Sequence, residues 1–356
     1  MLTADAPLVL LQHGGLDNLS GKTGLAMLRY RRGPIVAVID PAHAGADLQA
    51  ITGIPRAVPV VADMASALAF GPAVAVVGLA PSGGRLPPEM RADVVTALRS
   101  GLSLASGLHS RLADDPEFAA IPLVSGQWIW DLRHEPADLE VASARCAQLP
   151  CRRLLAVGSD MAVGKMSACL ELQAAAQRRG LDARFVGTGQ AGILISGQGV
   201  ALDAVRVDYA AGAVEAAVLT AAAGAGPEAF ILVEGQGSLA HPGSTATLPL
   251  LRGSQPTELL LVHRAAQTHV RTRPGAAPVA IPPLPELIQA CEALAALGRP
   301  DGLRPRVGAI ALNTALLDEQ AAEAEAQRIA AATGLPVVDP VRQGGERLLE
   351  VLWRPD

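Results

Sequence analysis

The chain is poor in aromatic residues, in cysteine motifs and in long apolar runs. It has three Trp, two Tyr and four Phe among 356 residues, so its core must be built from Ala, Val, Leu and Ile. Its cysteines (Cys146, Cys151, Cys169 and Cys291) lack CxxC or metal-ligand spacing, and we expect reduced thiols in a cytoplasmic protein. No uninterrupted apolar run reaches the ~18 residues of a membrane span. The N-terminal stretch lacks the basic region of a signal peptide.

The charge balance excludes a nucleic-acid binder that works through overall charge. Lys and Arg number 29 against 34 Asp and Glu, which gives a net charge of −5 and a pI near 5.8. With 50% hydrophobic and 18% charged residues, the chain is not disordered, and its length suggests about two domains. We expect neither a nucleic-acid nor a membrane partner, and a homodimer, the commonest symmetric assembly.

Lysine is the scarcest basic residue. Only Lys22 and Lys165 occur, and each follows a glycine, in Gly21-Lys22-Thr23 and Gly164-Lys165-Met166. In a chain so biased towards Arg, a lysine that follows Gly in a loop indicates a catalytic or binding role rather than an ordinary exposed residue.

Short apolar runs alternate with helical stretches, which predicts parallel sheets with helical crossovers. The expected strands of the first half are 8–12, 35–40, 58–62, 74–79, 102–106 and 128–132, with helices near 23–30, 63–70 and 88–100. Residues 134–152 mix charge and proline and mark a domain boundary. The expected strands of the second half are 154–157, 183–186, 229–234, 259–263, 307–313 and 336–338, with helices near 165–180, 212–223, 284–297 and 319–333 and a proline-rich loop at 274–285.

The strongest motif is Gly158-Ser-Asp-Met-Ala-Val-Gly164-Lys165, which follows an expected strand and opens an expected helix, as a P-loop does. Its glycines let backbone amides face a phosphate, the helix N-terminus adds positive potential, and Lys165 adds a point charge. A chance glycine-rich turn is the alternative. The expected cofactor-binding residues are Gly158, Ser159, Asp160, Val163, Gly164, Lys165, Met166, Ser167, Gln190 and Asn313.

One position departs from the standard motif. Met166 stands where Ser or Thr would bind the Mg²⁺ of a nucleotide, and a thioether is a poor ligand for that hard ion. A phosphate ligand that is bound but not transferred therefore fits better, and we expect no Mg²⁺.

Polar residues end two further strands of the second half. Glu234 ends the strand at 229–234, where ligands bind in open α/β sheets; it would bind a metal, act as a general base, or only cap the next turn. Asn313 ends another strand and would read an adenine edge, or merely form a turn.

The first half has glycine loops of its own. His13–Thr23 resembles a P-loop but is one residue too long from Gly15, so it is a weak phosphate site. Gly83-Gly84-Arg85 would hold a carboxylate or phosphate, or form an ordinary tight turn. The seven histidines show no HExxH or similar spacing, so we expect no metal site.

These motifs resemble known families. The second half is similar to the dethiobiotin synthetase branch of P-loop proteins, through the P-loop, the Glu234-Gly-Gln-Gly-Ser segment and a strand ending in Asn313. The whole chain resembles the two-domain P-loop family formerly labelled a domain of unknown function and now tied to D-glutamate N-acetyltransferase. The matching stretches are 22–30, 36–40, 78–87, 106–109, 131–133, 158–165, 188–194, 234–242 and 313–314.

The fold class expected from the pattern and the resemblance is α/β. An N-terminal Rossmann-like parallel-sheet domain would occupy residues 1–147, and a C-terminal P-loop NTPase-like α/β domain residues 148–356. The resemblance implies acetyl transfer from acetyl-CoA to the α-amino group of D-glutamate or a related D-amino acid. Two alternatives are a Mg-ATP-dependent kinase or ligase of the dethiobiotin synthetase type, which Met166 opposes, and a nucleotide-binding regulator without catalysis.

Acetyl transfer by direct amine attack needs a general base, since the free amine is mostly protonated at pH 7. Glu234 is the first candidate and Asp208 the second, with His241 and His109 weaker; Lys165 or loop amides would stabilise the oxyanion. No cysteine has an activating context, which disfavours an acyl-enzyme. The expected substrate-binding residues are Arg29, Gly83, Gly84, Arg85, His109, Arg133 and His241, the arginines serving the substrate carboxylates.

Overall fold

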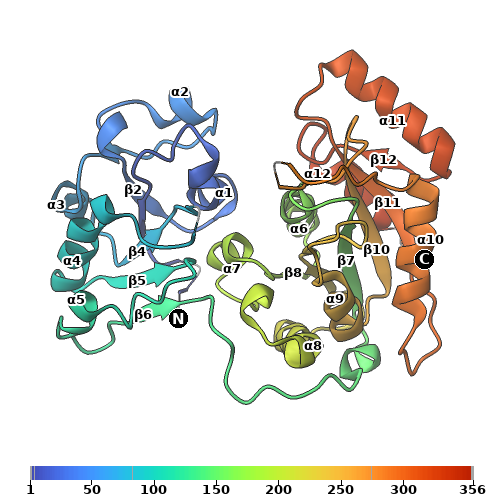
Figure 1. Cartoon of the computed structure of the whole chain (residues 1–356), viewed down its shortest axis with the longest axis horizontal. Coiled ribbons are helices and arrows are strands. Elements are labelled where there is room, and N and C mark those ends of the chain that lie inside the picture. The colour runs from blue at the N-terminus through green and yellow to red at the C-terminus, as the bar shows by residue number, and fades with distance from the viewer. Residues whose placement is uncertain (1, 4, 82, 274, 354–356) are drawn as a thin grey trace. The chain divides into compact units, whose positions relative to one another are not determined.

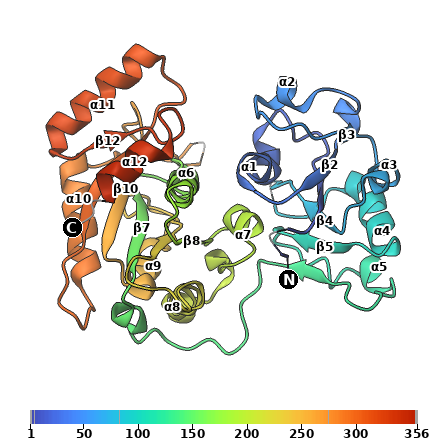
Figure 2. The same ribbon diagram turned by 180° about the vertical axis from the view of Figure 1, so that it is seen from behind.

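The computed structural model describes residues 2, 3, 5–81, 83–273 and 275–353. Ser82 in the predicted Gly-Gly-Arg loop, Pro274 of the proline-rich loop and the last three residues of the predicted second domain lie outside the described residues. Contacts divide the chain into unit 1, Met1–His134 with Gln190–Gly197, and unit 2, Glu135–Gly189 with Gln198–Asp356. Figures 1 and 2 show the elements of each unit from two sides.

The sheet of unit 1 has six parallel strands in the order β3-β2-β1-β4-β5-β6. This is the Rossmann order, in which the direction of strand addition reverses between β1 and β4, and ligands bind beyond the carboxyl ends of the strands at that point. The strands are β1 (Leu8–Leu11), β2 (Ile35–Ile39), β3 (Val60–Val61), β4 (Val74–Val77), β5 (Ser103–Ser106) and β6 (Ile129–Asp131).

Helices cover both faces of this sheet. Met64, Val94 and Phe118, from three of the helices, fill the core on one face, and Figures 1 and 2 show α1 and α4 on opposite sides of the strands. The helices are α1 (Lys22–Tyr30), α2 (Leu48–Thr52), α3 (Met64–Ala67), α4 (Arg91–Arg99), α5 (Pro116–Ala119) and α7 (Gln190–Ser196).

Helix α7 belongs to unit 1 although its sequence neighbours on both sides belong to unit 2. It packs against α1. Arg31, which is 3% exposed, donates to the carbonyls of Leu194 at 3.2 Å and Ile195 at 3.5 Å, so a buried guanidinium satisfies the last turn of α7.

The sheet of unit 2 also has six parallel strands, in the order β12-β11-β10-β7-β9-β8. Strand β7 lies between β9 and β10, so residues at the carboxyl ends of those two strands flank whatever follows β7. The strands are β7 (Arg152–Gly158), β8 (Ala183–Val186), β9 (Phe230–Val233), β10 (Glu258–Arg264), β11 (Arg306–Asn313) and β12 (Val337–Val338).

The main core of unit 2 forms where Val214, Leu250, Ile288 and Ile329 from four helices meet the strands. Two other helices, α6 and α12, pack against each other. The helices are α6 (Lys165–Arg178), α8 (Ala210–Ala221), α9 (Thr247–Ser254), α10 (Leu284–Ala296), α11 (Glu319–Thr333) and α12 (Gly345–Leu352). In the described part of the chain, no helix has the length and apolarity needed to cross a membrane.

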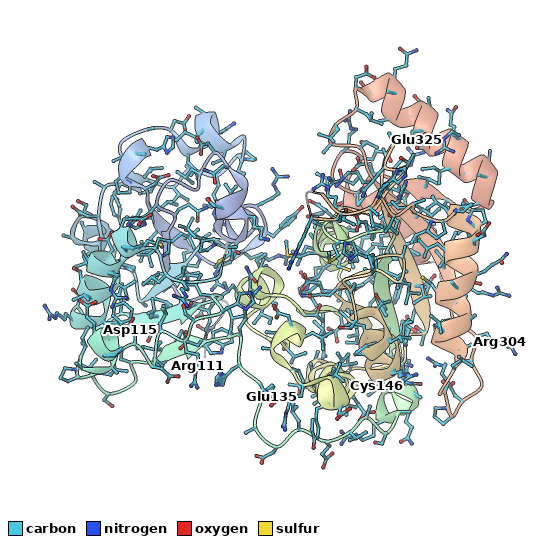
Figure 3. All side chains as sticks on the ribbon, in the orientation of Figure 1. Arg111, Asp115, Glu135, Cys146, Arg304 and Glu325 are labelled. Atoms are coloured by element: carbon cyan, nitrogen blue, oxygen red, sulfur yellow. The ribbon has the colours of Figure 1, made fainter. Side chains whose placement is uncertain are left out.

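Residues 135–147, which the sequence assigns to the first domain, make their contacts with unit 2. Glu135, labelled in Figure 3, accepts from Arg206 Nε at 2.9 Å. The fully buried carboxylate of Glu215 on α8 accepts from the amides of Ser143 at 3.3 Å and Arg145 at 2.7 Å. The first compact unit therefore ends at His134, and its remaining piece, α7, comes from much later in the sequence.

The α/β fold class and its two parallel sheets are confirmed. All twelve expected strands are present, with ends within two residues of those expected. Five helices were not expected from the sequence: α2, α5, α7, α9 and α12.

Candidate functional site

The predicted P-loop lies between β7 and α6 and folds with its lysine inward. Lys165 is 6% exposed, and its Nζ donates to the carbonyl of Asp160 at 2.8 Å. Ala162 and Gly164 have φ values of +53° and +114°, a conformation that turns successive amides to one side. A Cβ on Gly158 would lie 2.7 Å from Lys165 Nζ, so a larger residue at this position would displace the lysine.

The side chains of two predicted ligands are already used within the protein. The Asp160 carboxylate accepts from the amide of Met161 at 2.6 Å, from Gln267 Nε2 at 2.6 Å and from the amide of Arg271 at 2.8 Å. Ser159 Oγ is hydrogen-bonded to His263 Nδ1 at 2.8 Å, and burial lowers the pKa of His263 to about 4. These side chains hold the loop, and its backbone amides are the groups suited to a phosphate.

Asn313 supports the same loop. Its Nδ2 donates to the carbonyl of Val163 at 3.0 Å, and its Oδ1 accepts from the amide of Ala315 at 3.1 Å. Both ends of the amide are thus bonded to the backbone. Met166 and Ser167 lie half-buried in the first turn of α6.

Glu234, directly after β9, is the buried carboxylate of the site. It is 7% exposed and accepts from the amides of Thr188 at 2.8 Å and Gly189 at 3.2 Å. Burial raises the pKa of Glu234 to about 7, against the opposing effect of these amides and of Lys165. The carboxyl group can therefore gain and lose a proton near neutral pH.

The pKa of Lys165 moves in the opposite direction. Burial lowers it to about 8, although the charges of Asp160 and Glu234 favour the ammonium. The two groups are close enough for the charge of each to shift the pKa of the other. An acid and a base whose pKa values both move towards neutrality are typical of catalytic sites.

The other candidates for the base are placed differently. Asp208 lies exposed in the turn η7 (Val207–Tyr209), before α8. His241 uses both ring nitrogens on the backbone: Nε2 bonds the carbonyl of Arg271 at 2.8 Å, and Nδ1 accepts from the amide of Gly243 at 3.0 Å. Both ring nitrogens of His241 are thus engaged by the backbone, which gives the imidazole a structural role.

The cysteines are buried free thiols. Burial raises the pKa of Cys146 (labelled in Figure 3) and of Cys291 to about 12, and the pKa of Cys169 well above its ordinary value. Because the thiolate is the nucleophile, these groups are inert. In the described ranges, no three His, Cys, Asp or Glu side chains come together as metal ligands would.

Unit 1 contains a small pocket of about 130 Å³ at the carboxyl ends of its strands. It brings together three of the predicted substrate-binding residues, Gly84, His109 and Arg133. It also contains Gln190, which the sequence assigned to the cofactor, and Lys22, which the sequence ranked as a weak phosphate ligand. Its lining is Lys22, Ala80, Pro81, Gly84, Gly107, Leu108, His109, Arg133 and Gln190.

Four other predicted substrate-binding residues do not line this pocket: His241, described above, and Arg29, Gly83 and Arg85. Arg29 lies exposed in the last turn of α1, at the far end of that helix from Lys22. Gly83 and Arg85 lie exposed on either side of the buried Gly84.

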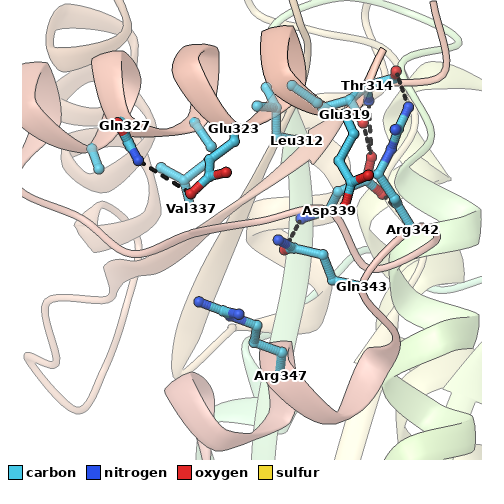
Figure 4. A pocket seen from close by; sticks show the side chains of 13 residues that line it. Leu312, Thr314, Glu319, Glu323, Gln327, Val337, Asp339, Arg342, Gln343 and Arg347 are labelled. Carbon is cyan, nitrogen blue, oxygen red and sulfur yellow. Dashed lines mark hydrogen bonds between the residues drawn. The ribbon is translucent and has the colours of Figure 1, made fainter. Parts of the chain in front are cut away.

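A larger pocket in unit 2, of about 480 Å³, lies between α11 and the loop after β12 (Figure 4). Asp339 there accepts from the amides of Thr314 at 3.1 Å and Val341 at 3.0 Å. Arg342 donates to the carbonyls of Thr314 at 3.1 Å and Leu317 at 2.6 Å. These groups hold two loops together, and the charged lining mixes acids with bases, so the pocket has no clear ligand chemistry.

Sequence reasoning missed Thr188 and Gly189, which hold Glu234 through backbone amides. A backbone donor has no side-chain signature, and only the Thr-Gly-Gln segment after β8 pointed to this place. Lys22, whose rarity the sequence already marks, lines the pocket of unit 1.

Comparison with known proteins agrees with this architecture. Residues 41–135 match a family model described as the DUF1611_N Rossmann-like domain, and residues 140–349 match the DUF1611_C P-loop domain, both of unknown function. A DUF1611 family protein from Anabaena variabilis, known from a crystal structure, is 52% identical, with a TM-score of 0.87 over 98% of this chain and 99% of that one.

Two curated relatives carry a functional name. A D-glutamate N-acetyltransferase from Tritonibacter scottomollicae is 35% identical over 98% of both chains. A second protein of the same name, from a Pseudoalteromonas species, is 34% identical over 77% of this chain and 79% of its own. The chain therefore belongs to the DUF1611 family, whose members combine a Rossmann-like and a P-loop domain and include acyltransferase enzymes.

Proposed function

We propose that this protein is an N-acetyltransferase that moves the acetyl group of acetyl-CoA to the α-amino group of D-glutamate. The names of two relatives, which match 98% and 77% of this chain, support this activity. The observation that carries the chemistry is Glu234, a buried carboxylate beside the P-loop whose pKa is raised to about 7.

The P-loop fits the phosphates of CoA. Its backbone amides and the N-terminus of α6 suit a pyrophosphate, and Lys165 adds a charge. Since Met166 supplies no hydroxyl for Mg²⁺, the loop is better suited to holding a phosphate than to transferring one.

Acetyl-CoA would supply an acetyl thioester, and residues of this chain would remove the proton from the α-ammonium group of the acceptor. The Glu234 carboxylate accepts a proton from the α-ammonium group, which frees the amine for attack. The amine nitrogen bonds to the thioester carbonyl carbon, the carbon–sulfur bond breaks, and the leaving thiolate takes up a proton. The oxyanion of the tetrahedral intermediate would need hydrogen-bond donors other than the P-loop groups that hold the CoA phosphates, and backbone amides of a neighbouring loop are suited to this role.

The test is release of free thiol from acetyl-CoA with a panel of D- and L-amino acids, first without and then with Mg-ATP. Thiol release with D-glutamate in the absence of ATP is the expected result. ADP formation with Mg-ATP and no thiol release with any amino acid would overturn the proposal and favour an ATP-dependent enzyme.

A further inference from the structure

The pocket of unit 1 lies at the edge where a sheet of this strand order binds ligands. Its lining comes from the loops after β4, β5 and β6, together with the first residues of α1 and α7. The loop before α1 is held by Gln12, whose Nε2 donates to the carbonyls of Gly15 at 3.2 Å and Gly21 at 2.8 Å. These hydrogen bonds fix the loop between β1 and α1 and so fix the position of Lys22. The residue lies beside the point, between β1 and β4, where the direction of strand addition reverses.

The electrostatics of the pocket favour an anion. Lys22 and Arg133 are cations, and the described lining contains no Asp or Glu. Lys22 is the exposed first residue of α1, and its ammonium makes no hydrogen bond or ion pair with any described residue. The first turn of α1 has no acidic residue and no side-chain cap, so the positive end of the helix dipole adds to the charge of Lys22.

Arg133 is oriented by its neighbours. Its guanidinium donates to Gln190 Oε1 and contacts His109 Nε2, and Gln190 Nε2 donates to Thr23 Oγ1 at 3.1 Å. A guanidinium held in one plane is suited to bidentate recognition of a carboxylate.

Two glycines allow this arrangement. A Cβ on Gly84 would lie 2.3 Å from the His109 ring, and a Cβ on Gly107 would lie 2.8 Å from Gln190. The loop after β4 therefore approaches His109, and the loop after β5 approaches Gln190, more closely than a residue with a side chain would permit. The two glycines thus shape the lining of the pocket.

We propose that this pocket binds the two carboxylates of the acceptor amino acid, one at the Lys22 ammonium and the other at the Arg133 guanidinium. The proposal rests on the acetyltransferase function above and assigns its substrate class: a dicarboxylic amino acid, selected over its amide and over monocarboxylic amino acids. Lys22 is the residue that sets this preference, because an amide offers its ammonium no charge.

The first test measures binding without the reaction. Isothermal titration of the full-length protein uses glutarate, a dicarboxylate without an amino group, and butyrate, its monocarboxylate counterpart. We expect Lys22→Gln and Arg133→Gln each to weaken glutarate binding at least ~10-fold, whereas Lys22→Arg stays within a few-fold. The control Arg32→Gln, which removes an exposed charge just after α1, should bind glutarate like the wild type.

The second test uses the reaction. Lys22→Gln should raise the KM for D-glutamate at least ~10-fold and leave the KM for acetyl-CoA unchanged. It should also reduce the ratio of kcat/KM for D-glutamate to kcat/KM for D-glutamine. Thiol release with unaltered D-glutamate KM in Lys22→Gln would overturn the pocket assignment and leave the acetyltransferase standing. Glutarate binding that depends on Lys22 and Arg133, without any thiol release, would support the pocket and overturn the acetyltransferase.

Discussion

Thr188 and Glu234 hold each other through two hydrogen bonds of opposite sense. The amide of Thr188 donates to the Glu234 carboxylate at 2.8 Å, and the Thr188 hydroxyl donates to the Glu234 carbonyl at 2.9 Å. The carboxylate is thus oriented by the backbone after β8 and not by a cation in direct contact. This leaves it as an oriented acceptor beside the P-loop, which is what a general base requires.

Replacing Glu234 with Gln should abolish turnover while acetyl-CoA binding survives. The amide keeps the size of the side chain but cannot accept the substrate proton, and general bases contribute ~10²–10⁴-fold to rate. Thiol-release assays give kcat, and titration with CoA gives the binding constant. An unchanged kcat would remove Glu234 from the role of base.

The rate should rise with pH through about 7. Glu234 must be ionised to accept a proton, and its pKa is raised to about 7, so kcat should fall ~10-fold per unit well below that pH. The same shift, upward from 4.5, means that the folded state favours the protonated acid, so stability is lost as pH rises towards 7. A kcat–pH profile without this limb, or an unchanged pH dependence of Tm in Glu234→Gln, would contradict the assignment.

Lys165→Met should raise the KM for acetyl-CoA more than it changes the KM for D-glutamate. A charge-assisted contact with phosphate is worth ~1.5–3 kcal/mol, or about 10- to 100-fold in KM. Initial rates with each substrate varied in turn separate the two constants. A selective rise in the KM for D-glutamate would argue against binding of CoA phosphates at the P-loop.

Gly84→Ala should disturb His109 as well as the backbone. Gly84 has a φ of +63°, which costs a residue with a side chain ~1 kcal/mol, and its new Cβ would also meet the His109 ring. Gly53→Ala is the matched control, since Gly53 has a φ of +67° with nothing within 4 Å of its Cβ position.

We expect Gly84→Ala to lower Tm more than Gly53→Ala does and to raise the KM for D-glutamate, which Gly53→Ala should leave unaltered. Adding His109→Ala to Gly84→Ala should recover the extra loss of Tm. Equal Tm losses in the two glycine variants would show that the contact with His109 carries no cost.

The strands could be predicted from sequence because each is a short, fully buried apolar run, such as Ile35–Ile39 or Phe230–Val233. The unexpected helices lack such a signal. Helix α9 contains a proline and a glycine, and α7 begins in a Thr-Gly-Gln-Ala-Gly stretch typical of a loop. Their helical form depends on packing that local propensity does not encode.

Those parts of the site could be predicted in which a characteristic residue type stands at the carboxyl end of an expected strand. The P-loop and Glu234 follow strands β7 and β9, which are neighbours in the sheet. Asn313 illustrates the limit: its place at a strand end was compatible with an adenine ligand or with a turn, and in the fold both ends of its amide bond the backbone, at Val163 and Ala315. Which polar groups are already satisfied depends on loops that come together only in the fold.

The position of helix α7 in the sequence limits where this chain can be divided into fragments or recombined with a related chain. A gene fragment that stops after residue 147 would encode all six strands of unit 1 but not α7, leaving Arg31 and the face of α1 without the helix they contact. A fragment that starts there would carry α7 away from its partner. The two halves are therefore not interchangeable modules, and recombination between distant relatives at the apparent boundary would separate Gln190 from Arg133 and Thr23.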